Sequence, residues 1–248
     1  MQPERPHISI LIPVLNEIRT IREAVRQISA AASTGMVVEV LAIDGGSTDG
    51  SWECLEELAA HGMLHRLIRQ SAWGKGGAVM EGAGQAAGAV VAVFDADLEY
   101  DAADVYRVAE PVFSRAADIG LGTRTRNRLG MRRPVRWPDV VEGLPLDIGT
   151  FALETIIKIR TRAPYKDPFC MHRCWRAELT PMLPWGTPGF GWDLDMLLSA
   201  QEQGWLVAQT PVRYHPRNFS SGKKLRPYRD SMDNLRVLAQ HVAFRKQR

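Results

Sequence analysis

The first 120 residues switch repeatedly between two hydrophobic periods, and this alternation limits the folds that the chain can adopt. Short apolar runs typical of buried strands are separated by segments whose apolar residues recur at helical spacing. The expected strands are 7–14, 37–43, 65–70 and 89–94, and the expected helices between them are 17–32, 47–62 and 74–88. Parallel strands need crossover connections, which are usually helices. The order therefore predicts an α/β, Rossmann-like fold, in which helices cover both faces of a mostly parallel sheet.

Beyond Gly122 the pattern changes. Six arginines between Arg124 and Arg136 lie in a segment without apolar period, which predicts a basic loop, either solvated or able to close over a ligand. The later expected elements are a helix near 146–160, a strand around 167–172, a helix at 193–203, a strand at 205–215, a polar loop at 216–227 and a basic amphipathic helix from about residue 227. We find no repeat and no long linker, so we expect a single domain over residues 1–248.

Composition places the chain among globular proteins and gives weak evidence about its partners. With 248 residues, 45% of them hydrophobic and 24% charged, it can fill one sizeable core. A net charge of +3 is too small to indicate nucleic-acid binding by itself. Three cysteines and the absence of a signal-peptide pattern predict a reducing, cytoplasmic location. No apolar run approaches the roughly 20 residues of a membrane span.

Three acidic residues follow the expected strand 89–94 at alternate positions: Asp95, Asp97 and Glu99. Like charges this close cost free energy unless a cation compensates them. Residues two apart in a strand face the same side, so the carboxylates could converge on Mg²⁺ or Mn²⁺, which prefer oxygen ligands. An EF-hand is excluded, because Tyr100 and Tyr106 occupy the positions of its glycine and glutamate. For this fragment alone, an equal alternative is that the three acids lie at a helix N-terminus, where the helix dipole favours negative charge.

A further strand end and a helix start carry polar groups suited to a ligand. Asp44 ends the second expected strand, and Gly45 and Gly46 permit close backbone approach, so its carboxylate could accept hydrogen bonds from a nucleobase or ribose. The alternative is a turn with a helix cap. Lys75 begins a helix but lacks the flanking residues of a phosphate loop, and it could meet an anion there. Ligands of such sheets collect at the carboxyl ends of the strands, so we expect these groups in one site.

Taken together, several stretches resemble the family-2 glycosyltransferases of GT-A fold, most closely the polyprenol- or dolichol-phosphate mannosyltransferase-like branch. They are SILIPVLNE, VLAIDGGSTDGS, GKGGAVMEGAGQAAGAVVAVFDADLEYDAADV, DIGLGTR and GFGWDLDMLLSAQEQGWLVAQTPVRYHPR, and they cover most of the chain. The resemblance implies inverting, divalent-metal-dependent transfer of a mannose- or glucose-type sugar. The donor would be a nucleoside-diphosphate sugar bound by residues 1–122, and the acceptor a polyprenyl phosphate bound by residues 123–248.

The same resemblance assigns roles to individual residues. The nucleotide pocket would be lined by Pro13, Asn16, Glu17 and Asp44. Asp95 and Asp97 would meet ribose, diphosphate and metal, and Arg124 and Arg217 would face phosphates. Apart from the resemblance, the carboxylate of Glu99 makes it a candidate third metal ligand, and Lys75 at its helix N-terminus is a candidate anion contact. Asp195 matches the family's acid, but the sequence leaves open whether Asp193, Asp195 or neither removes a proton. A phosphate acceptor arrives already ionised and needs no strong base.

Departures from the family pattern keep other functions open. The family usually has two acids where this chain has Asp44 and Gly45, and glutamine in place of Glu99; the stretch from Arg217 to Lys224 is longer than usual. A soluble small-molecule acceptor is therefore the second expectation. A sugar-phosphate nucleotidyltransferase would need a glycine-rich segment after the first strand, where PVLNEIRT has no glycine. A nucleotide-binding module without catalysis is a further alternative. The last helix could contact an anionic membrane peripherally or pack on the domain.

Overall fold

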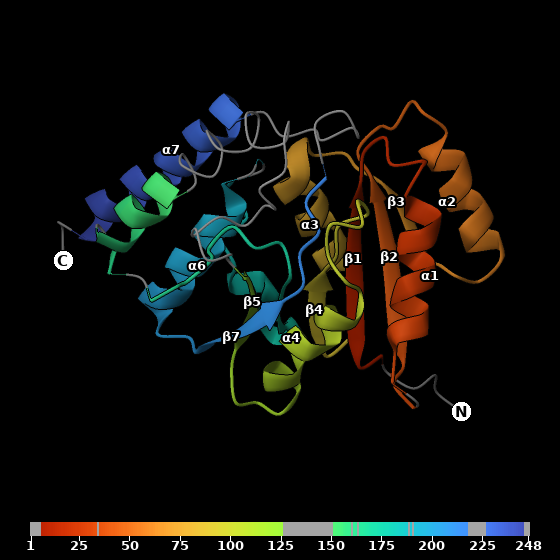
Figure 1. Ribbon diagram of the computed structural model, residues 1–248, viewed down its shortest axis with the longest axis horizontal. Coiled ribbons are helices and arrows are strands. Elements are labelled where there is room, and N and C mark those ends of the chain that lie inside the picture. Colours follow the sequence, from red (N-terminus) through yellow and green to blue (C-terminus); the bar gives the residue numbers. More distant parts are fainter. Residues whose placement is uncertain are drawn as a thin grey trace.

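The computed structural model describes residues 6–33, 35–125, 151–159, 161–162, 164–187, 189, 191–217 and 227–245 (Figure 1). Its elements are, in chain order, β1 (Ile8–Val14), α1 (Ile21–Ala31), β2 (Val38–Asp44), α2 (Ser51–Ala60), β3 (Arg66–Arg69), α3 (Gly74–Gln85), β4 (Val90–Val93), α4 (Ala103–Phe113), β5 (Ile119–Arg124), β6 (Arg173–Arg176), the 3₁₀ helix η1 (Ala177–Met182), α6 (Trp192–Gln203), β7 (Val207–Val212) and α7 (Pro227–Arg245). Residues 151–159 are also helical.

The described strands form one seven-stranded sheet in the order β3-β2-β1-β4-β6-β5-β7. β1 is the third strand in this order and pairs in parallel with β2 and β4, so that Leu11 lies opposite both Leu41 and Val93. β6 is antiparallel to its neighbours β4 and β5, and β5 pairs in parallel with β7. The predicted mostly parallel α/β sheet is confirmed. All the strands that flank β1 end at the same edge, where the predicted site residues lie.

Helices cover both faces of the sheet (Figure 1). α1 packs against α2 and α4, and Tyr106 Oη of α4 donates a hydrogen bond to Ile28 O of α1 at 2.8 Å. α3 packs on the other face against β1 and β2. This approach requires glycine at Gly82, because a Cβ there would lie 2.8 Å from Cδ1 of Ile43 and 3.1 Å from Cδ2 of Leu11.

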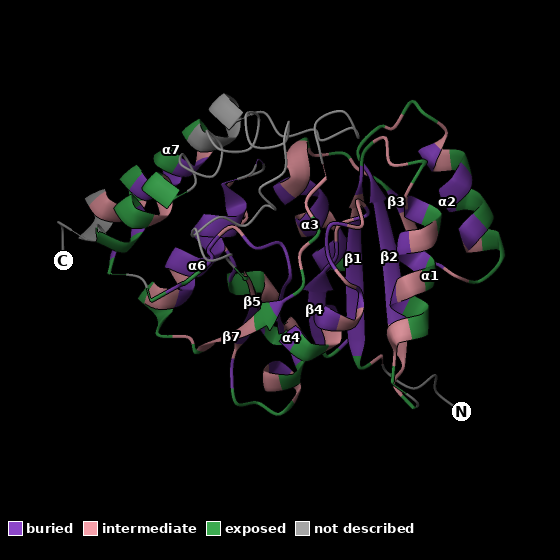
Figure 2. Cartoon of the chain, in the orientation of Figure 1, coloured by how far each residue is buried: buried purple, intermediate pink, exposed green. Residues whose placement is uncertain are grey.

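The hydrophobic core lies between the sheet and these helices. β1 and β4 are buried along most of their length, and Figure 2 shows the buried colour running through the centre of the sheet while the outer faces of α1 and α2 are exposed. A strand covered on both faces has no polar face, which explains the continuous apolar runs in the sequence. The core is thus a rigid base for the loops at the strand ends.

Several predicted boundaries are wrong, and some elements, including η1, escaped prediction. The strand expected at 167–172 lies at β6 instead, because Asp167 and the residues after it form turns. α1 begins at Ile21 rather than at residue 17. The helix α4 and the strand β5 were not predicted. The basic loop was expected from Arg124 to Arg136; Arg124 instead ends β5, and residues 126–136 lie outside the described residues.

The last helix, α7, packs its apolar side on the domain. Val237 and Leu238 are buried, and α7 contacts α6. This is one of the two alternatives that the sequence left open for the helix. No helix within the described ranges combines the length and apolar character needed to cross a bilayer.

Candidate active site

The loops that follow β1 and β2 are joined by hydrogen bonds between side chains and main chain. Asn16 Oδ1 accepts from Thr48 N at 2.7 Å, and Asn16 N donates to Ser47 Oγ at 2.8 Å. Asn16 has a φ of 53°, a left-handed conformation that asparagine tolerates better than most residues. Glu17 N donates to Ser51 Oγ at 2.8 Å. Asn16 therefore shapes the edge at which a nucleotide was predicted to bind, close to Pro13 at the end of β1.

Asp44 lies at the end of β2, beside the end of β1 in the sheet register. Its carboxylate is 1% exposed and accepts hydrogen bonds from Gly46 N at 3.0 Å and Ser47 N at 3.1 Å. Asp44 thus holds the turn after its own strand, which is the turn-forming role that the sequence left open. A contact with a nucleobase or ribose remains a prediction.

Asp95 pairs with Lys75 across two elements. Asp95 follows β4, and Lys75 lies in the first turn of α3; Lys75 Nζ is 2.5 Å from Asp95 Oδ1, and both side chains are 15% exposed. A cation at a helix N-terminus is disfavoured by the helix dipole, so the carboxylate offsets a cost that Lys75 would otherwise bear. The pair brings two residues predicted separately into one site.

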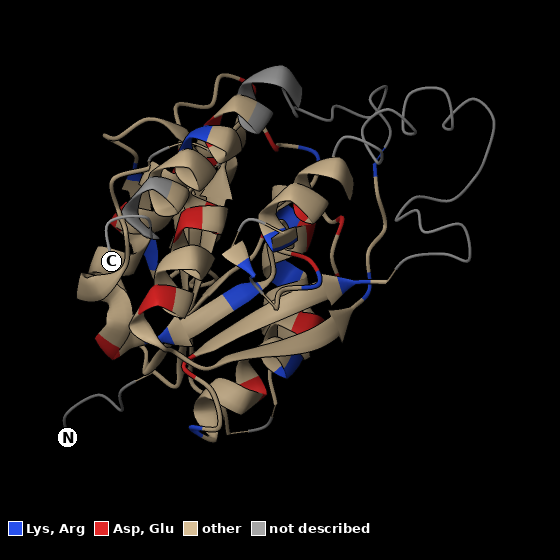
Figure 3. Cartoon of the chain, turned by 90° about the vertical axis from the view of Figure 1, so that its left-hand side faces the viewer, with Lys and Arg blue, Asp and Glu red and all other residues tan. Residues whose placement is uncertain are grey.

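Arg217 connects the loop after β4 with the loop after β1. Its Nη2 lies 3.2 Å from Asp97 Oδ2, and its Nη1 lies 3.2 Å from Glu17 Oε2. These three side chains come from segments as far as 200 residues apart in the sequence. In Figure 3 the loops beyond the strand ends carry both basic and acidic positions, consistent with this ionic network. Glu17, Asp97 and Arg217 are therefore neighbours, as the resemblance implied.

The acidic cluster carries more negative charge than its surroundings compensate. Burial, and after it the negative charges of Asp95 and Glu99, raise the pKa of Asp97 to about 7. Glu99 is 6% exposed; its Oε2 accepts a hydrogen bond from Tyr214 Oη and its Oε1 one from Arg217 N, both at 2.8 Å. An additional cation beside Asp97 would relieve the repulsion.

Arg124, at the end of β5, is bound by a carboxylate of the protein. Its Nε and Nη2 donate to the two carboxylate oxygens of Asp167, each at 2.8 Å, and its main-chain N donates to the same residue at 3.0 Å. Asp167 is 1% exposed. The guanidinium carbon of Arg124 also lies 5.1 Å from the ring centre of Tyr214. Contact between Arg124 and a substrate phosphate remains a prediction.

The two acids at the start of α6 differ in surroundings. Burial raises the pKa of Asp193, whereas the positive charges of Arg173 and Lys75 lower it and Asp95 raises it, so Asp193 lies within electrostatic reach of the Lys75–Asp95 pair. Its Oδ1 is buried and accepts no hydrogen bond from the described residues. Asp193 is thus influenced by the charges of Lys75 and Asp95, and a role for it in proton transfer remains a prediction.

Asp195 is engaged on the side of α7. Its Oδ2 accepts from Thr187 Oγ1 at 2.7 Å, and its Oδ1 lies 2.8 Å from His241 Nε2. His241 Nδ1 lies 2.8 Å from Glu202 Oε1. These contacts attach α7 to α6, so the structure gives Asp195 a structural role. No contact joins it to Asp95 or Asp97 among the described side chains.

Three residues of the site escaped prediction: Tyr214, Asp167 and Arg173. Asp167 precedes a proline, which is a turn signal, and Arg173 is an isolated charge within the otherwise apolar stretch FCMHRCW. Tyr214 carried no sequence signal. Each acts through a partner at least 20 residues away, and for that reason only the folded chain reveals it.

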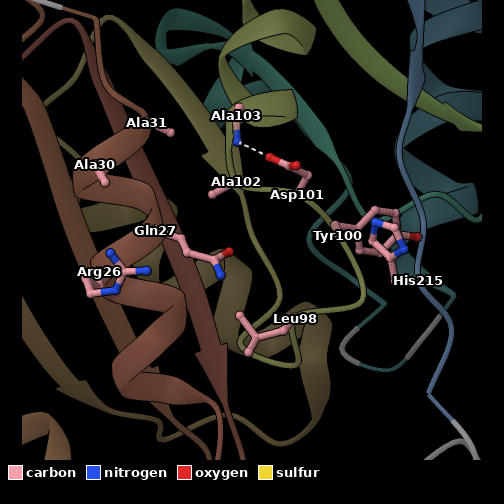
Figure 4. Close-up of a pocket in the computed structure, with 10 residues that line it drawn as sticks. All are labelled: Arg26, Gln27, Ala30, Ala31, Leu98, Tyr100, Asp101, Ala102, Ala103 and His215. Atoms are coloured by element: carbon pink, nitrogen blue, oxygen red, sulfur yellow. Dashed lines mark hydrogen bonds between the residues drawn. The ribbon is translucent and has the colours of Figure 1, made fainter.

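A cavity of about 400 Å³ lies beside the acidic cluster, between α1 and the chain that leads from Asp97 into α4 (Figure 4). Its walls include Gln27, Leu98 and His215, whereas Asp97 and Glu99 are not among the described residues that line it. Leu98 has a φ of 59°, which turns the chain so that its side chain lines this cavity. The cavity is therefore separate from the acidic cluster.

Comparison with known structures defines the class of protein. The chain resembles the crystal structure of glucosyl-3-phosphoglycerate synthase from Mycobacterium tuberculosis in complex with UDP, with a TM-score of 0.71 and 20% identity, over 96% of this chain and 80% of the other. The fold is thus the GT-A fold of glycosyltransferases. The family model for glycosyl transferase family 2 matches residues 9–175, which is more than half of the chain. The chain belongs to this family and is a glycosyltransferase.

Relatives with known names extend the comparison. Glycosyltransferase AglJ of Haloferax volcanii is 29% identical over 238 residues, which are 92% of this chain and 69% of AglJ. Undecaprenyl-phosphate 4-deoxy-4-formamido-L-arabinose transferase of Pseudomonas fluorescens is 30% identical over 183 residues, 72% of this chain and 50% of that enzyme. The glucosyl-3-phosphoglycerate synthase has also been crystallised with Mn²⁺, UDP-glucose and phosphoglyceric acid.

Proposed function

We propose that the protein is an inverting, divalent-metal-dependent glycosyltransferase that moves a mannose- or glucose-type sugar from a nucleoside diphosphate to a phosphate-bearing acceptor, in the first instance a polyprenyl phosphate. The observation that carries this proposal is the Asp95–Asp97–Glu99 cluster at the strand edge, with the pKa of Asp97 raised to about 7 by burial and neighbouring charge. A cation would reduce the repulsion within this cluster, and the same cation would stabilise the negative charge on a departing diphosphate.

The donor atoms of the cluster fit Mg²⁺ or Mn²⁺, which take carboxylate oxygens and shared phosphate oxygens. Asp97 and Asp95 are the residues that would hold the ion, since Glu99 already accepts two hydrogen bonds from the protein. Within the described residues no preformed group of three or more metal-binding side chains exists. The proposal therefore assigns the remaining ligands to the donor's diphosphate. The ion would stabilise the charge that develops on the leaving diphosphate.

The side chains around the cluster have separate tasks in this reaction. Lys75, now paired with Asp95, supplies positive charge at the position where the diphosphate develops negative charge. Asn16 keeps the loop after β1 in place beside the nucleotide. In an inverting transfer the acceptor attacks from the face opposite the leaving group. Asp193, within electrostatic reach of Lys75 and Asp95, is the carboxylate that would meet that acceptor.

Two observations support different acceptors. Arg217 is suited to a phosphate because a guanidinium can make bidentate contacts with phosphate oxygens, and it favours a phosphate-bearing acceptor such as a polyprenyl phosphate. The buried Asp193 Oδ1 without a hydrogen-bond partner among the described residues favours a second candidate, a soluble acceptor that reacts through a hydroxyl group. A hydroxyl must lose its proton, and a positioned carboxylate can accept it.

The experiment that tests the function offers the protein UDP- and GDP-linked glucose and mannose with Mn²⁺. Each donor is tested alone, with a short polyprenyl phosphate in detergent, and with soluble phosphate-bearing or hydroxyl-bearing acceptors. The readout is released nucleoside diphosphate and the mass of the glycosylated acceptor. We expect one donor to react and a polyprenyl phosphate to accept. Product with only a soluble acceptor would move the function to the second candidate, and no turnover of any donor would contradict both.

A further inference from the structure

The first residue of β6, Arg173, is a buried cation. Arg173 is 1% exposed, and its guanidinium donates three hydrogen bonds to main-chain oxygens: from Nη1 to Asp193 at 2.7 Å, and from Nη2 to Cys170 at 2.7 Å and to Pro168 at 3.2 Å. These bonds connect the N-terminus of α6 with the turn at residues 167–170. Arg173 therefore fixes the position of α6 relative to the sheet.

The location of this charge is unfavourable unless a carboxylate offsets it. A helix N-terminus carries partial positive charge, so the helix dipole disfavours a cation there. The three carbonyl groups satisfy hydrogen bonds but carry no net charge, and burying an unpaired ion is costly. The carboxylate beside it is that of Asp193, whose Oδ1 lies 3.8 Å from Nη1. Arg173 and Asp193 thus stabilise each other's charged forms.

The distance of 3.8 Å between Arg173 Nη1 and Asp193 Oδ1 determines how the two groups interact. It is short enough for strong attraction in a buried site and too long for a hydrogen bond. Asp193 Oδ1 consequently keeps its lone pairs, and no described group donates to it. A carboxylate gripped by two guanidinium N–H groups would be a weaker acceptor for a proton or for a substrate hydroxyl. In this protein Arg173 attracts Asp193 electrostatically, while Asp193 Oδ1 accepts no hydrogen bond from the described residues.

Arg173 also supports the opposite wall of the site. The turn that it holds begins at Asp167, which binds Arg124 through two hydrogen bonds of 2.8 Å. Displacement of this turn would move Arg124 and Asp193 together. A single buried side chain therefore sets the spacing between two groups that face the site from different elements.

We propose that Arg173 is a positioning residue of the transferase: it holds Asp193 at the acceptor side of the site and leaves the carboxylate oxygen free. The inference rests on the proposed function with a hydroxyl-bearing acceptor, because only such an acceptor must give up a proton to Asp193. Arg173 does not touch the substrates in this account. Its effect passes through the main chain and the charge of Asp193.

The test compares two substitutions of Arg173 with a matched control. R173Q removes the charge and keeps hydrogen-bond donors, and R173K keeps a charge with fewer donors. We expect kcat of R173Q to fall about 100-fold, the loss typical of a misplacement of about 1 Å, and R173K to recover about tenfold of it. The KM for the donor should change by less than about threefold, because the donor groups lie on β1, β2 and β4. The acid limb of the kcat–pH profile should move to higher pH in R173Q, since Asp193 loses its nearby positive charge.

The control is R176Q, three residues further along β6. Arg176 pairs with Asp118 and Glu178, away from α6, so R176Q removes an ionic arginine from the same strand. We expect its kcat and pH profile to match the wild type. Thermal unfolding and titration with UDP and Mn²⁺ establish that each variant is folded and binds nucleotide.

The outcomes separate this inference from the function beneath it. If D193N keeps wild-type turnover, the role proposed for Asp193 fails and the role of Arg173 fails with it. If D193N is inactive while folded R173Q keeps wild-type kcat and pH profile, only the positioning role is overturned. Should R173Q fail to fold, R173K decides: a kcat reduced about tenfold at unchanged donor KM supports the proposal, and a wild-type kcat overturns it.

Discussion

At the scale of single residues, the site is defined by which carboxylates are already bound by the protein. Asp44 and Asp195 accept hydrogen bonds from neighbours that hold a turn and a helix. Asp97 and Asp193 lie among groups of mixed charge, and burial raises the pKa of both. Sequence spacing alone gives these acids equal standing. Their surroundings distinguish the two acids that hold structure, Asp44 and Asp195, from the two to which the proposed function assigns a part in the reaction, Asp97 and Asp193.

Asp193 and Asp195 should therefore respond differently to the same substitution. With a hydroxyl-bearing acceptor, we expect D193N to lower kcat by about 10²- to 10⁴-fold, because a general base contributes in this range. D193N should also lower stability, because it removes the charge that offsets the buried Arg173. D195N should keep most of its turnover and unfold at lower temperature, because it loses the contact with His241. Steady-state kinetics and thermal unfolding of both variants check this. The reverse pattern would return the catalytic role to Asp195.

At the scale of elements, α7 is attached to α6 through one titratable residue. His241 lies between Asp195 and Glu202, at 2.8 Å from each. Burial lowers the pKa of His241, but the hydrogen bonds and charges of the two carboxylates raise it more, so the pKa lies above its ordinary value of 6.5. The protonated ring donates to both acids, whereas the neutral ring can donate to only one. The attachment of α7 is thus strongest when His241 is charged.

The sign of the pH dependence follows from this raised pKa. The stabilisation by His241 is fully present below its unfolded value and is lost as pH rises through its folded value. We expect H241Q to lower the free energy of unfolding by about 1.5–3 kcal/mol at pH 6, the range of hydrogen bonds to charged groups, and by much less at pH 9. Denaturant unfolding at the two pH values measures the difference. An equal effect at both would show that the charge of His241 does not contribute.

The packing of α4 on β5 and β6 depends on a glycine. A Cβ at Gly120 would lie 2.2 Å from Val108 O of α4 and 2.7 Å from Cys174 Sγ of β6. We expect G120A to lower the free energy of unfolding by about 1–3 kcal/mol or more, because main-chain atoms must move. Gly84 in α3 is the matched control, since a Cβ there meets nothing within 4 Å. G84A should stabilise by about 0.4–1 kcal/mol in a denaturant titration. Equal stability of the two variants would contradict the close approach of α4.

At the scale of the whole molecule, the first half of the sheet was predictable and the second half was only partly so. β1, β2 and β4 are buried on both faces, and their apolar runs are separated by clear helical periods. β6 is four residues long with an arginine at each end, so no apolar run marks it. α4 did carry a signal, because its buried Val105, Val108, Ala109 and Val112 recur at helical spacing.

The site was predictable as a set of residues and not as a set of contacts. Strand-end placement identified Asp44, Asp95 and Asp97, because carboxyl ends of parallel strands meet at one edge. Which acid pairs with which base depends on contacts such as Arg217 with Glu17, 200 residues apart, and Arg124 with Asp167, 43 apart. No local pattern encodes them. The choice between Asp193 and Asp195 likewise depends on where α7 packs.

Binding of UDP and GDP, measured by calorimetry with Mn²⁺ and with EDTA, tests the central claim most directly, namely that Asp97 joins a cation to the donor's diphosphate. We predict that Mn²⁺ strengthens binding of one of these nucleotides about tenfold or more, which is about 1.4 kcal/mol. D97N should remain folded, with a melting temperature no lower than the wild type, because it removes one charge from a repelling cluster, and it should lose this gain. Equal affinity with Mn²⁺ and EDTA, or a full metal effect in D97N, would contradict the account.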